Sequence, residues 1–132
     1  MIYLTTEQVL FIHDRIIEEI GGEHGVRDLN SLESALGRPR AGFGATEFYP
    51  DRMMKAAVLM DGIIRNHPFV DGNKRTGIAA AVLFLRINGY EVSATNQVLE
   101  SFTQHVTTQK PEISELAHWF RQHGATIRSE KK

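Results

Sequence analysis

The stretch HPFVDGNKRTGIAAAVLFLRINGY, residues 67–90, decides the fold. Its second part, Thr76 to Tyr90, is apolar on every side for more than three helical turns, and a helix without a polar face belongs in the centre of a bundle. Its first part, His67 to Arg75, joins an imidazole, a carboxylate, a glycine-asparagine step and two cations. We therefore expect a central apolar helix that begins at a polar turn, whose side chains can bind ligands or take part in a reaction.

Helical signals continue on both sides of this stretch. Thr5 and Gln8 form a capping-box pattern ahead of apolar positions at helical spacing, which end at Gly21-Gly22. We expect further helices over residues 28–37, about 51–66, 73–87, around 98–106 and around 113–120. Gly42 to Pro50 is predicted to form a loop, a small flap or a β-hairpin, and residues 90–94 a short extended piece. The predicted fold is an all-α, compact single-domain bundle of about six helices.

The composition and charge of the chain limit the classes of function that it can have. The chain of 132 residues suits one domain, for which we predict residues 1–126, followed by a flexible tail at 127–132. Fifteen Lys plus Arg against sixteen Asp plus Glu give a formal charge of -1, so we expect no direct binding of nucleic acid. The chain has no cysteine, no leader pattern and no long apolar run, so we expect a cytoplasmic protein without membrane contact.

The residues after Asp71 predict an anion site. Pro68 and Gly72 disfavour continuous helix, whereas Asn73 onward fits one, so Gly72 to Arg75 should form a first helical turn. The backbone N–H groups of such a turn lack intrahelical acceptors and face anions at the positive end of the helix dipole. Lys74 and Arg75 add positive charge, and Arg75 adds a bidentate fork. This pattern indicates a phosphate cradle.

Asp71 and His67 supply groups that a reaction at the bound phosphate would need. A carboxylate beside a phosphate repels it unless a divalent cation lies between them, and Mg²⁺ binds through one carboxylate together with nucleotide phosphates and water. Histidine exchanges a proton readily near neutral pH, so His67 is a candidate general base for an incoming hydroxyl. The set indicates phosphate-group transfer from a nucleotide to an alcohol. Phe69 is expected to anchor the loop in the core.

Other interpretations apply to the same residues. His67 and Asp71 have the i, i+4 spacing of a metal pair if one helix runs through both, and Lys74 and Arg75 could be surface charge only. His13 lies on an apolar helix face and is predicted to be a packed, hydrogen-bonded side chain. Asp28 is predicted to cap a helix. The remaining histidines receive no role, and Met53, Met54 and Met60 are predicted to fill the core.

Residues 67–75 resemble the signature of the Fic and death-on-curing (Doc) superfamily, H-x-F-x-D/E-x-N-x-R, at every fixed position. Fic adenylyltransferases read HPFxDGNGR and Doc toxins read HxFxDANKR, so Pro68 and Gly72 are Fic-like and Lys74 is Doc-like. LTTEQVLFIHDRIIEE, GVRDLNSLESALGRP, FYPDRMMKAAVLMDGIIRNHPF and LFLRINGYEVSA resemble Doc segments in the same order. The resemblance covers nearly the whole chain and favours Doc.

The resemblance implies a toxin of a type II toxin-antitoxin pair, which uses ATP and Mg²⁺ to phosphorylate a threonine of translation elongation factor Tu. By position, His67 would be the base and Asp71 the metal ligand. Gly72 and Asn73 would form the anion nest, and Lys74 and Arg75 would hold the phosphates. Lys74 fills the space that Fic enzymes leave for an α-phosphate, which implies transfer of the γ-phosphoryl group.

Two further implications concern partners. Gly42 to Pro50 resembles the family's flap, which pairs with the target protein in extended form. The chain lacks the Ser/Thr-x-x-x-Glu-Gly/Asn motif by which many Fic enzymes inhibit themselves, so inhibition would come from a separate cognate antitoxin. A Fic-type adenylyltransferase and a non-catalytic nucleotide-binding module remain the alternatives.

Overall fold

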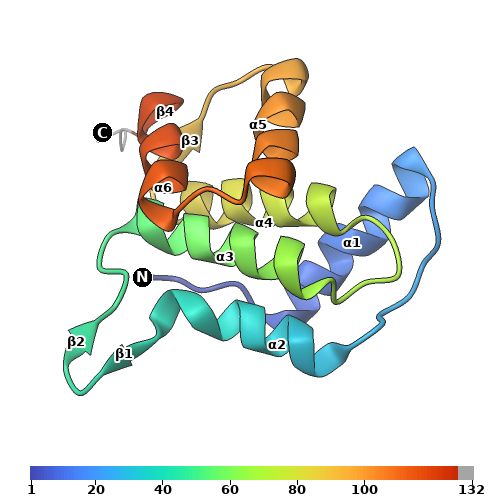
Figure 1. Cartoon of the computed structure of the whole chain (residues 1–132), viewed down its shortest axis with the longest axis horizontal. Coiled ribbons are helices and arrows are strands. Elements are labelled where there is room, and N and C mark those ends of the chain that lie inside the picture. Colours follow the sequence, from blue (N-terminus) through green and yellow to red (C-terminus); the bar gives the residue numbers. More distant parts are fainter. Residues whose placement is uncertain (128–132) are drawn as a thin grey trace, which may run out of the picture.

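The computed structural model describes residues 1–127 and is a bundle of helices (Figure 1). Six α-helices occur in this range, as predicted: α1 (Thr6–Ile20), α2 (Leu29–Gly37), α3 (Arg52–Asn66), α4 (Asn73–Ile87), α5 (Asn96–Gln109) and α6 (Ile113–Gln122). A 3₁₀ turn, η1 (Arg38–Arg40), follows α2. No helix within residues 1–127 is long and apolar enough to span a bilayer.

Side-chain caps set where several helices begin. Thr5 and Gln8 form the predicted capping box, with Thr5 accepting from the Gln8 N–H and Gln8 accepting from the Thr5 N–H. Asp28 accepts from the Ser31 N–H at the start of α2, which confirms its predicted role as a cap. Such caps satisfy N–H groups that the first turn cannot pair internally. These helix starts are therefore decided by short-range contacts.

Helix α3 holds the centre of the bundle, where we expected α4. Most of α3 is buried, and it packs against α2, α4, α6 and η1. Helix α4 lies along it with one side more open, because Lys74, Arg75 and Arg86 are exposed. The sequence pattern hid this arrangement because α3 contains Lys55 and Asp61, which read as polar positions yet are buried. Each has charged or carbonyl partners that make its burial possible.

Lys55 ties a β-hairpin to α3. The hairpin pairs β1 (Gly42–Phe43) with β2 (Thr46–Glu47), as the sequence allowed. The Lys55 ammonium, 1% exposed, donates to the Pro39 carbonyl at 2.8 Å and to the Glu47 carboxylate. Burial pulls the pKa of Lys55 down, but its hydrogen bonds with Glu47 and Tyr3 outweigh burial and raise that pKa above its usual value. The hairpin is thus held at the start of α3.

A second strand pair closes the end of the described chain. β3 (Tyr90–Val92) pairs antiparallel with β4 (Gly124–Thr126), with Tyr90 opposite Thr126. The sequence predicted the extended piece of β3 but not its partner β4. Ile127, assigned to the tail, donates its N–H to the Gly89 carbonyl at 2.8 Å and continues this pairing. The rest of the predicted tail, 128–132, lies outside the described residues.

Candidate functional site

The motif forms the turn between α3 and α4. His67 ends α3 in the left-handed conformation (φ 50°, ψ 54°), and Gly72 precedes α4 in the same region (φ 79°, ψ 18°). The helix is therefore broken between His67 and Asp71, which excludes the i, i+4 metal pair on one continuous helix. As predicted, α4 begins at Asn73. The two helices run back along each other and present this turn at one end of the bundle (Figure 1).

Asn73 fixes the shape of the turn through its buried side chain. Its Oδ1 accepts from the Phe69 N–H at 3.0 Å, and its Nδ2 donates to the Phe69 carbonyl at 3.0 Å. Phe69 is 1% exposed and belongs to the core, so it anchors the loop as expected. The Asn73 side chain thus satisfies two buried backbone groups that no helix or strand would pair. Its role is to shape the turn, while only its backbone belongs to the first turn of α4.

His67 is exposed and reaches the same asparagine. The Asn73 Nδ2 lies 3.3 Å from the His67 Nδ1. An amide nitrogen donates and does not accept, so Nδ1 accepts here and a neutral ring carries its hydrogen on Nε2. For Nε2 to take a proton, the hydrogen must first move to Nδ1, and the Asn73 contact is then lost. The proton-accepting form of His67 is therefore linked to this contact.

His13 of α1 contacts two residues of the motif turn. Its ring stacks on Phe69 at 3.8 Å between centroids and 6° between planes, and its Nε2 donates to the Asp71 carbonyl at 2.7 Å. The prediction of a packed, hydrogen-bonded His13 is confirmed, but the sequence did not show that its partner is the motif. Gly72 lies close by: a side chain there would meet Ile17 at 3.2 Å, and its positive φ also favours glycine.

Residues 21–28, called the flanking segment below, run beside the motif. The Glu23 N–H donates to the Asp71 Oδ2 at 3.0 Å, and the Val70 N–H donates to the Gly25 carbonyl at 3.1 Å. Val26 and Phe69 form an antiparallel bridge. One oxygen of the Asp71 carboxylate is therefore oriented by backbone from a distant part of the sequence. The sequence offered only the glycine-rich composition of this segment as a signal.

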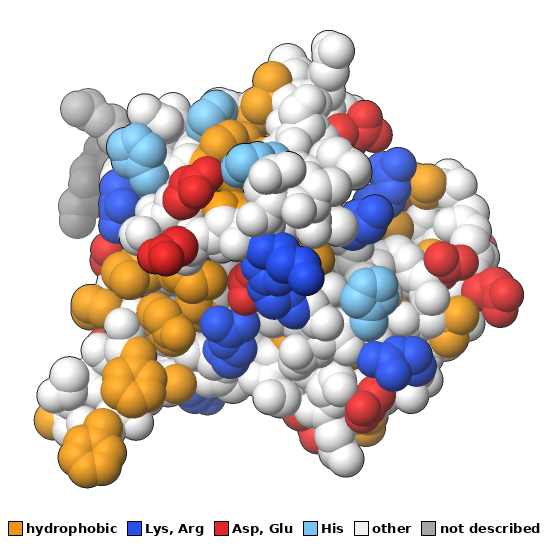
Figure 2. All heavy atoms as spheres, viewed as in Figure 1, with side chains coloured by type: hydrophobic (Ala, Val, Ile, Leu, Met, Phe, Trp, Pro, Cys, Tyr) orange, Lys and Arg blue, Asp and Glu red, His pale blue; other side chains and the backbone are white. Residues whose placement is uncertain are grey.

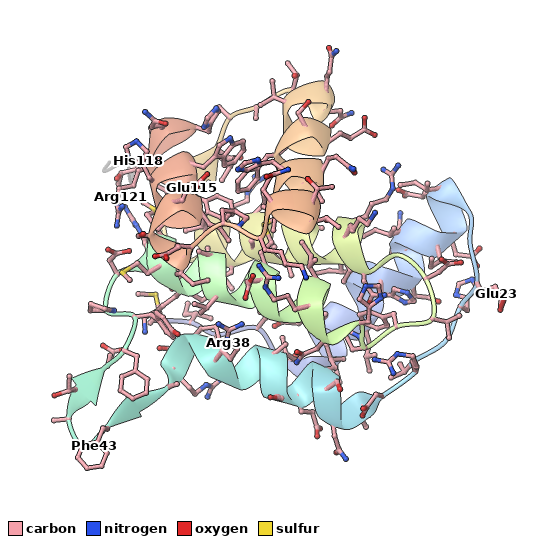
Figure 3. All side chains as sticks on the ribbon, viewed as in Figure 1. Glu23, Arg38, Phe43, Glu115, His118 and Arg121 are labelled. Carbon is pink, nitrogen blue, oxygen red and sulfur yellow. The ribbon has the colours of Figure 1, made fainter. Side chains whose placement is uncertain are left out.

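The hairpin within Gly42–Pro50, which the resemblance predicts to be a flap that pairs with the target protein, lies away from the motif turn. The hairpin precedes the first residue of α3, whereas the motif follows its last residue. A helix of 15 residues is about 20 Å long, so the two lie at opposite ends of α3. Figure 3 shows the separation, with Phe43 at the hairpin tip on one side and Glu23 on the other. The flanking segment, and not the hairpin, borders the motif.

Arg27 binds backbone carbonyl groups at the end of α3. Its Nε donates to the His67 carbonyl at 2.7 Å, and its guanidinium NH2 group donates to the Asn66 carbonyl at 2.8 Å. The last carbonyls of a helix lack intrahelical donors and carry partial negative charge, so a cation there is stabilising. Arg27 consequently helps to hold the backbone that presents His67. Sequence reasoning missed it because its partners lie forty residues away in the chain.

The start of α4 has the features of the predicted phosphate cradle. The first intrahelical bond runs from the Thr76 N–H to the Gly72 carbonyl at 2.9 Å, and no side chain caps this end. The N–H groups of the preceding residues therefore come before the hydrogen-bonded ladder. Lys74 and Arg75 are exposed on this turn, and Arg75 lies 3.7 Å from Glu100 of α5. Within residues 1–127 no three His, Asp or Glu side chains converge as a metal site.

A groove of about 930 Å³ opens beside Lys74 and Arg75, between α1, α4 and α5. Its volume is within the range of ligand sites, roughly 300–1,000 Å³. Ile16, Ile20, Ile78 and Leu99 give it apolar walls, while α5 adds polar groups such as Gln104. The groove thus combines an apolar surface with a cationic end at the motif.

The protein is a helical bundle with a polar turn that joins an imidazole, a carboxylate and a helix N-terminus. Residues 3–85 match the model of the Fic/DOC family. The chain therefore belongs to the Fic/DOC family. It is 41% identical over 99 residues to "Toxin Doc" of Mycolicibacterium smegmatis, covering 74% of this chain and 76% of that protein. It is 32% identical over 121 residues to "Protein kinase doc" of Escherichia phage P1, covering 92% and 94%.

Proposed function

We propose that this protein is a toxin that transfers the γ-phosphoryl group of ATP to a hydroxyl of a protein. The observation that carries this proposal is the motif turn, where His67, the Asp71 carboxylate and the uncapped start of α4 lie within one short loop. Similarity to a phage P1 protein named a protein kinase supports the phosphoryl-transfer class. Similarity to a protein named Toxin Doc supports the toxic role.

His67 accepts the proton of the target hydroxyl in this proposal. The residue is exposed, so a protein substrate can reach it, and its backbone is held by Arg27. A fixed base near an incoming hydroxyl contributes through both orientation and proton transfer. When His67 acts as a base at Nε2, its Nδ1 carries the ring hydrogen, so the contact between Nδ1 and the Asn73 Nδ2 is lost.

Asp71 holds Mg²⁺ in this proposal, and the metal supplies charge neutralisation between the carboxylate and the phosphates. The fit rests on the donor set: a hard carboxylate, oriented by the Glu23 N–H, beside an uncapped helix N-terminus. Lys74 and Arg75, both exposed, would bind phosphate oxygens, and the absence of a side chain at Gly72 leaves room at the turn. These residues would bind ATP mainly through its triphosphate.

A cognate antitoxin is the partner that we assign to the groove beside Lys74 and Arg75. Its apolar walls on α1, α4 and α5 suit the apolar face of an amphipathic helix, and its cationic end suits an acidic residue of that helix. An occupant would reach Arg75, which the proposed reaction uses. Occupation of the groove would therefore inhibit the enzyme without covering His67 directly.

Translation elongation factor Tu is the proposed substrate, with a threonine as acceptor and arrest of protein synthesis in the cytoplasm as the result. The test is incubation with that factor and Mg²⁺ and with ATP labelled at either the α- or the γ-phosphorus. The proposal predicts protein-bound label from the γ position only. Label from the α position would instead show AMP transfer, the Fic-type alternative.

His67→Ala and Asp71→Ala are the matched variants for this assay. Both residues are exposed, so each variant should keep the circular dichroism spectrum and melting temperature of the parent within a few degrees. Loss of both labelling and growth arrest is expected. Toxicity that survives in both variants would reject catalysis and favour the non-catalytic nucleotide-binding module.

A further inference from the structure

Asp61 is a buried carboxylate in the middle of α3 with two arginine partners. Its Oδ2 accepts from the Arg38 guanidinium NH1 group at 3.0 Å, and its Oδ1 accepts from the Arg65 Nε at 2.6 Å. The Asp61 side chain is 7% exposed, whereas those of Arg38 and Arg65 are 34% and 35% exposed. One buried negative charge therefore holds two half-exposed positive charges. Arg38 and Arg65 are called the arginine pair below.

Glycine at position 62 makes room for this arrangement. A side chain at Gly62 would meet the Ala35 Cβ at 3.0 Å and the Arg38 Cδ at 3.5 Å. Helix α2 consequently packs closely on α3, and the stem of Arg38 lies across the helix to reach Asp61. Figure 3 shows Arg38 between α2 and α3 on the face turned to the viewer. The pair is therefore built by tertiary packing and is not a chance surface contact.

Stability alone does not account for the triad. Burying a carboxylate costs desolvation energy, and apolar side chains of similar volume commonly stabilise a core as well or better. What the triad adds is two guanidinium groups with fixed orientation and a net positive charge. Arg65 binds Asp61 only through Nε, and Arg38 only through NH1, so each has further N–H donors that no residue in the range 1–127 accepts.

Arg65 connects the arginine pair to the candidate active site, whereas Arg38 reaches Asp61 from η1. Arg65 is in the last turn of α3, two residues before His67. Figure 2 shows Lys and Arg side chains across the centre and right of this face, with a histidine among them. Lys74 and Arg75 have the phosphates as proposed partners, and Arg27 binds the end of α3. Among residues 1–127, the arginine pair has no such partner beyond Asp61.

We propose that the arginine pair binds an acidic side chain of the same protein substrate that presents its hydroxyl to His67. This deepens the proposed function, since it rests on a protein as the acceptor. A planar guanidinium matches a carboxylate in a bidentate fashion, and a rim of positive charge also speeds encounter with an acidic surface. Arg38 and Arg65 then determine which acidic segment is selected, and they take no part in the chemistry.

The test measures binding without catalysis. A fluorescein-labelled Glu-rich peptide and its Gln-substituted counterpart are titrated with the His67→Ala protein, in the absence of ATP and at two salt concentrations. Arg38→Gln and Arg65→Gln are each combined with Asp61→Asn, so that no buried charge loses its partners. Arg121→Gln is the control, because Arg121 is a half-exposed arginine of α6 in a 2.7 Å ion pair with Asp51.

We expect the Glu-rich peptide to bind in a salt-sensitive manner and the Gln-rich peptide to bind more weakly. Either arginine variant should weaken binding roughly tenfold, the effect of one lost charge-assisted hydrogen bond, while Arg121→Gln leaves it unchanged. Equal binding by all variants, absence of binding by the parent, or loss caused by Arg75→Gln alone would overturn the proposal. Because no ATP is used, these outcomes are independent of whether the phosphoryl-transfer assay succeeds.

Discussion

Replacement of Asn73 by alanine is the sharpest test of how the motif turn is built. The substitution removes the amide that pairs with both the Phe69 N–H and the Phe69 carbonyl, each at 3.0 Å. Phe69 and Asn73 are 1% and 5% exposed, so the two backbone groups have little access to water. A buried polar group without a partner costs about 1–3 kcal/mol. The two groups together therefore predict a loss of about 2–6 kcal/mol in the free energy of unfolding.

That loss is a large share of the total stability of a domain, which is about 5–15 kcal/mol. At roughly 4 °C per kcal/mol for a chain of this size, the melting temperature should fall by about 8–24 °C. Urea unfolding followed by circular dichroism measures the free energy directly. The slope with urea should stay the same if the loss is local to the turn.

Asn30→Ala is the control, because Asn30 is an exposed asparagine in α2 and the substitution should change the free energy of unfolding by no more than about 0.5 kcal/mol. Activity should fall in Asn73→Ala even below its melting range, since the His67 ring and the Asp71 carbonyl both depend on this turn. A loss of stability as small as that of the control would show that the amide pairing is not what holds the turn. The account of the site given above would then be wrong.

Three further predictions concern groups around the site and the hairpin. The substitution His13→Phe keeps the stack on Phe69 but leaves the Asp71 carbonyl without its hydrogen-bond donor. We expect kcat to fall and urea unfolding to show a loss of about 1–3 kcal/mol in the free energy of unfolding. A kcat equal to that of the parent would exclude a positioning role for His13. The Thr76 hydroxyl is buried without a partner in residues 1–127, so Thr76→Val should raise the unfolding free energy by about 1 kcal/mol, and a decrease would mean that water satisfies the hydroxyl. The pKa of Lys55 is raised in the fold, so the stability that Lys55 contributes is complete below its unfolded pKa near 10.5 and is lost as the pH rises above that value. The substitution Glu47→Gln should lower the urea midpoint at pH 7 and make the further fall of that midpoint between about pH 10 and 11.5 smaller. The same pH dependence in the variant and the parent would contradict this account of Lys55.

Sequence was a sufficient guide wherever contacts are local. The capping box at Thr5, the cap at Asp28 and the break at Pro68 to Gly72 each depend on residues a few positions apart, and each was predicted correctly. The composition of the motif also determined which chemical groups meet, because nine consecutive residues cannot be far apart. The family followed from the same residues.

Tertiary structure decided the rest. Burial of Lys55 and Asp61 made α3 the central helix, although its charges suggested otherwise. The hydrogen-bond partners of His13 and Arg27 are 39 to 58 residues away in the chain, and no periodicity in the sequence encodes such separations. The same holds for the pairing of the flanking segment with the motif. Local patterns state what each segment can form, but only packing states which segments meet, because contact between distant residues depends on the whole core.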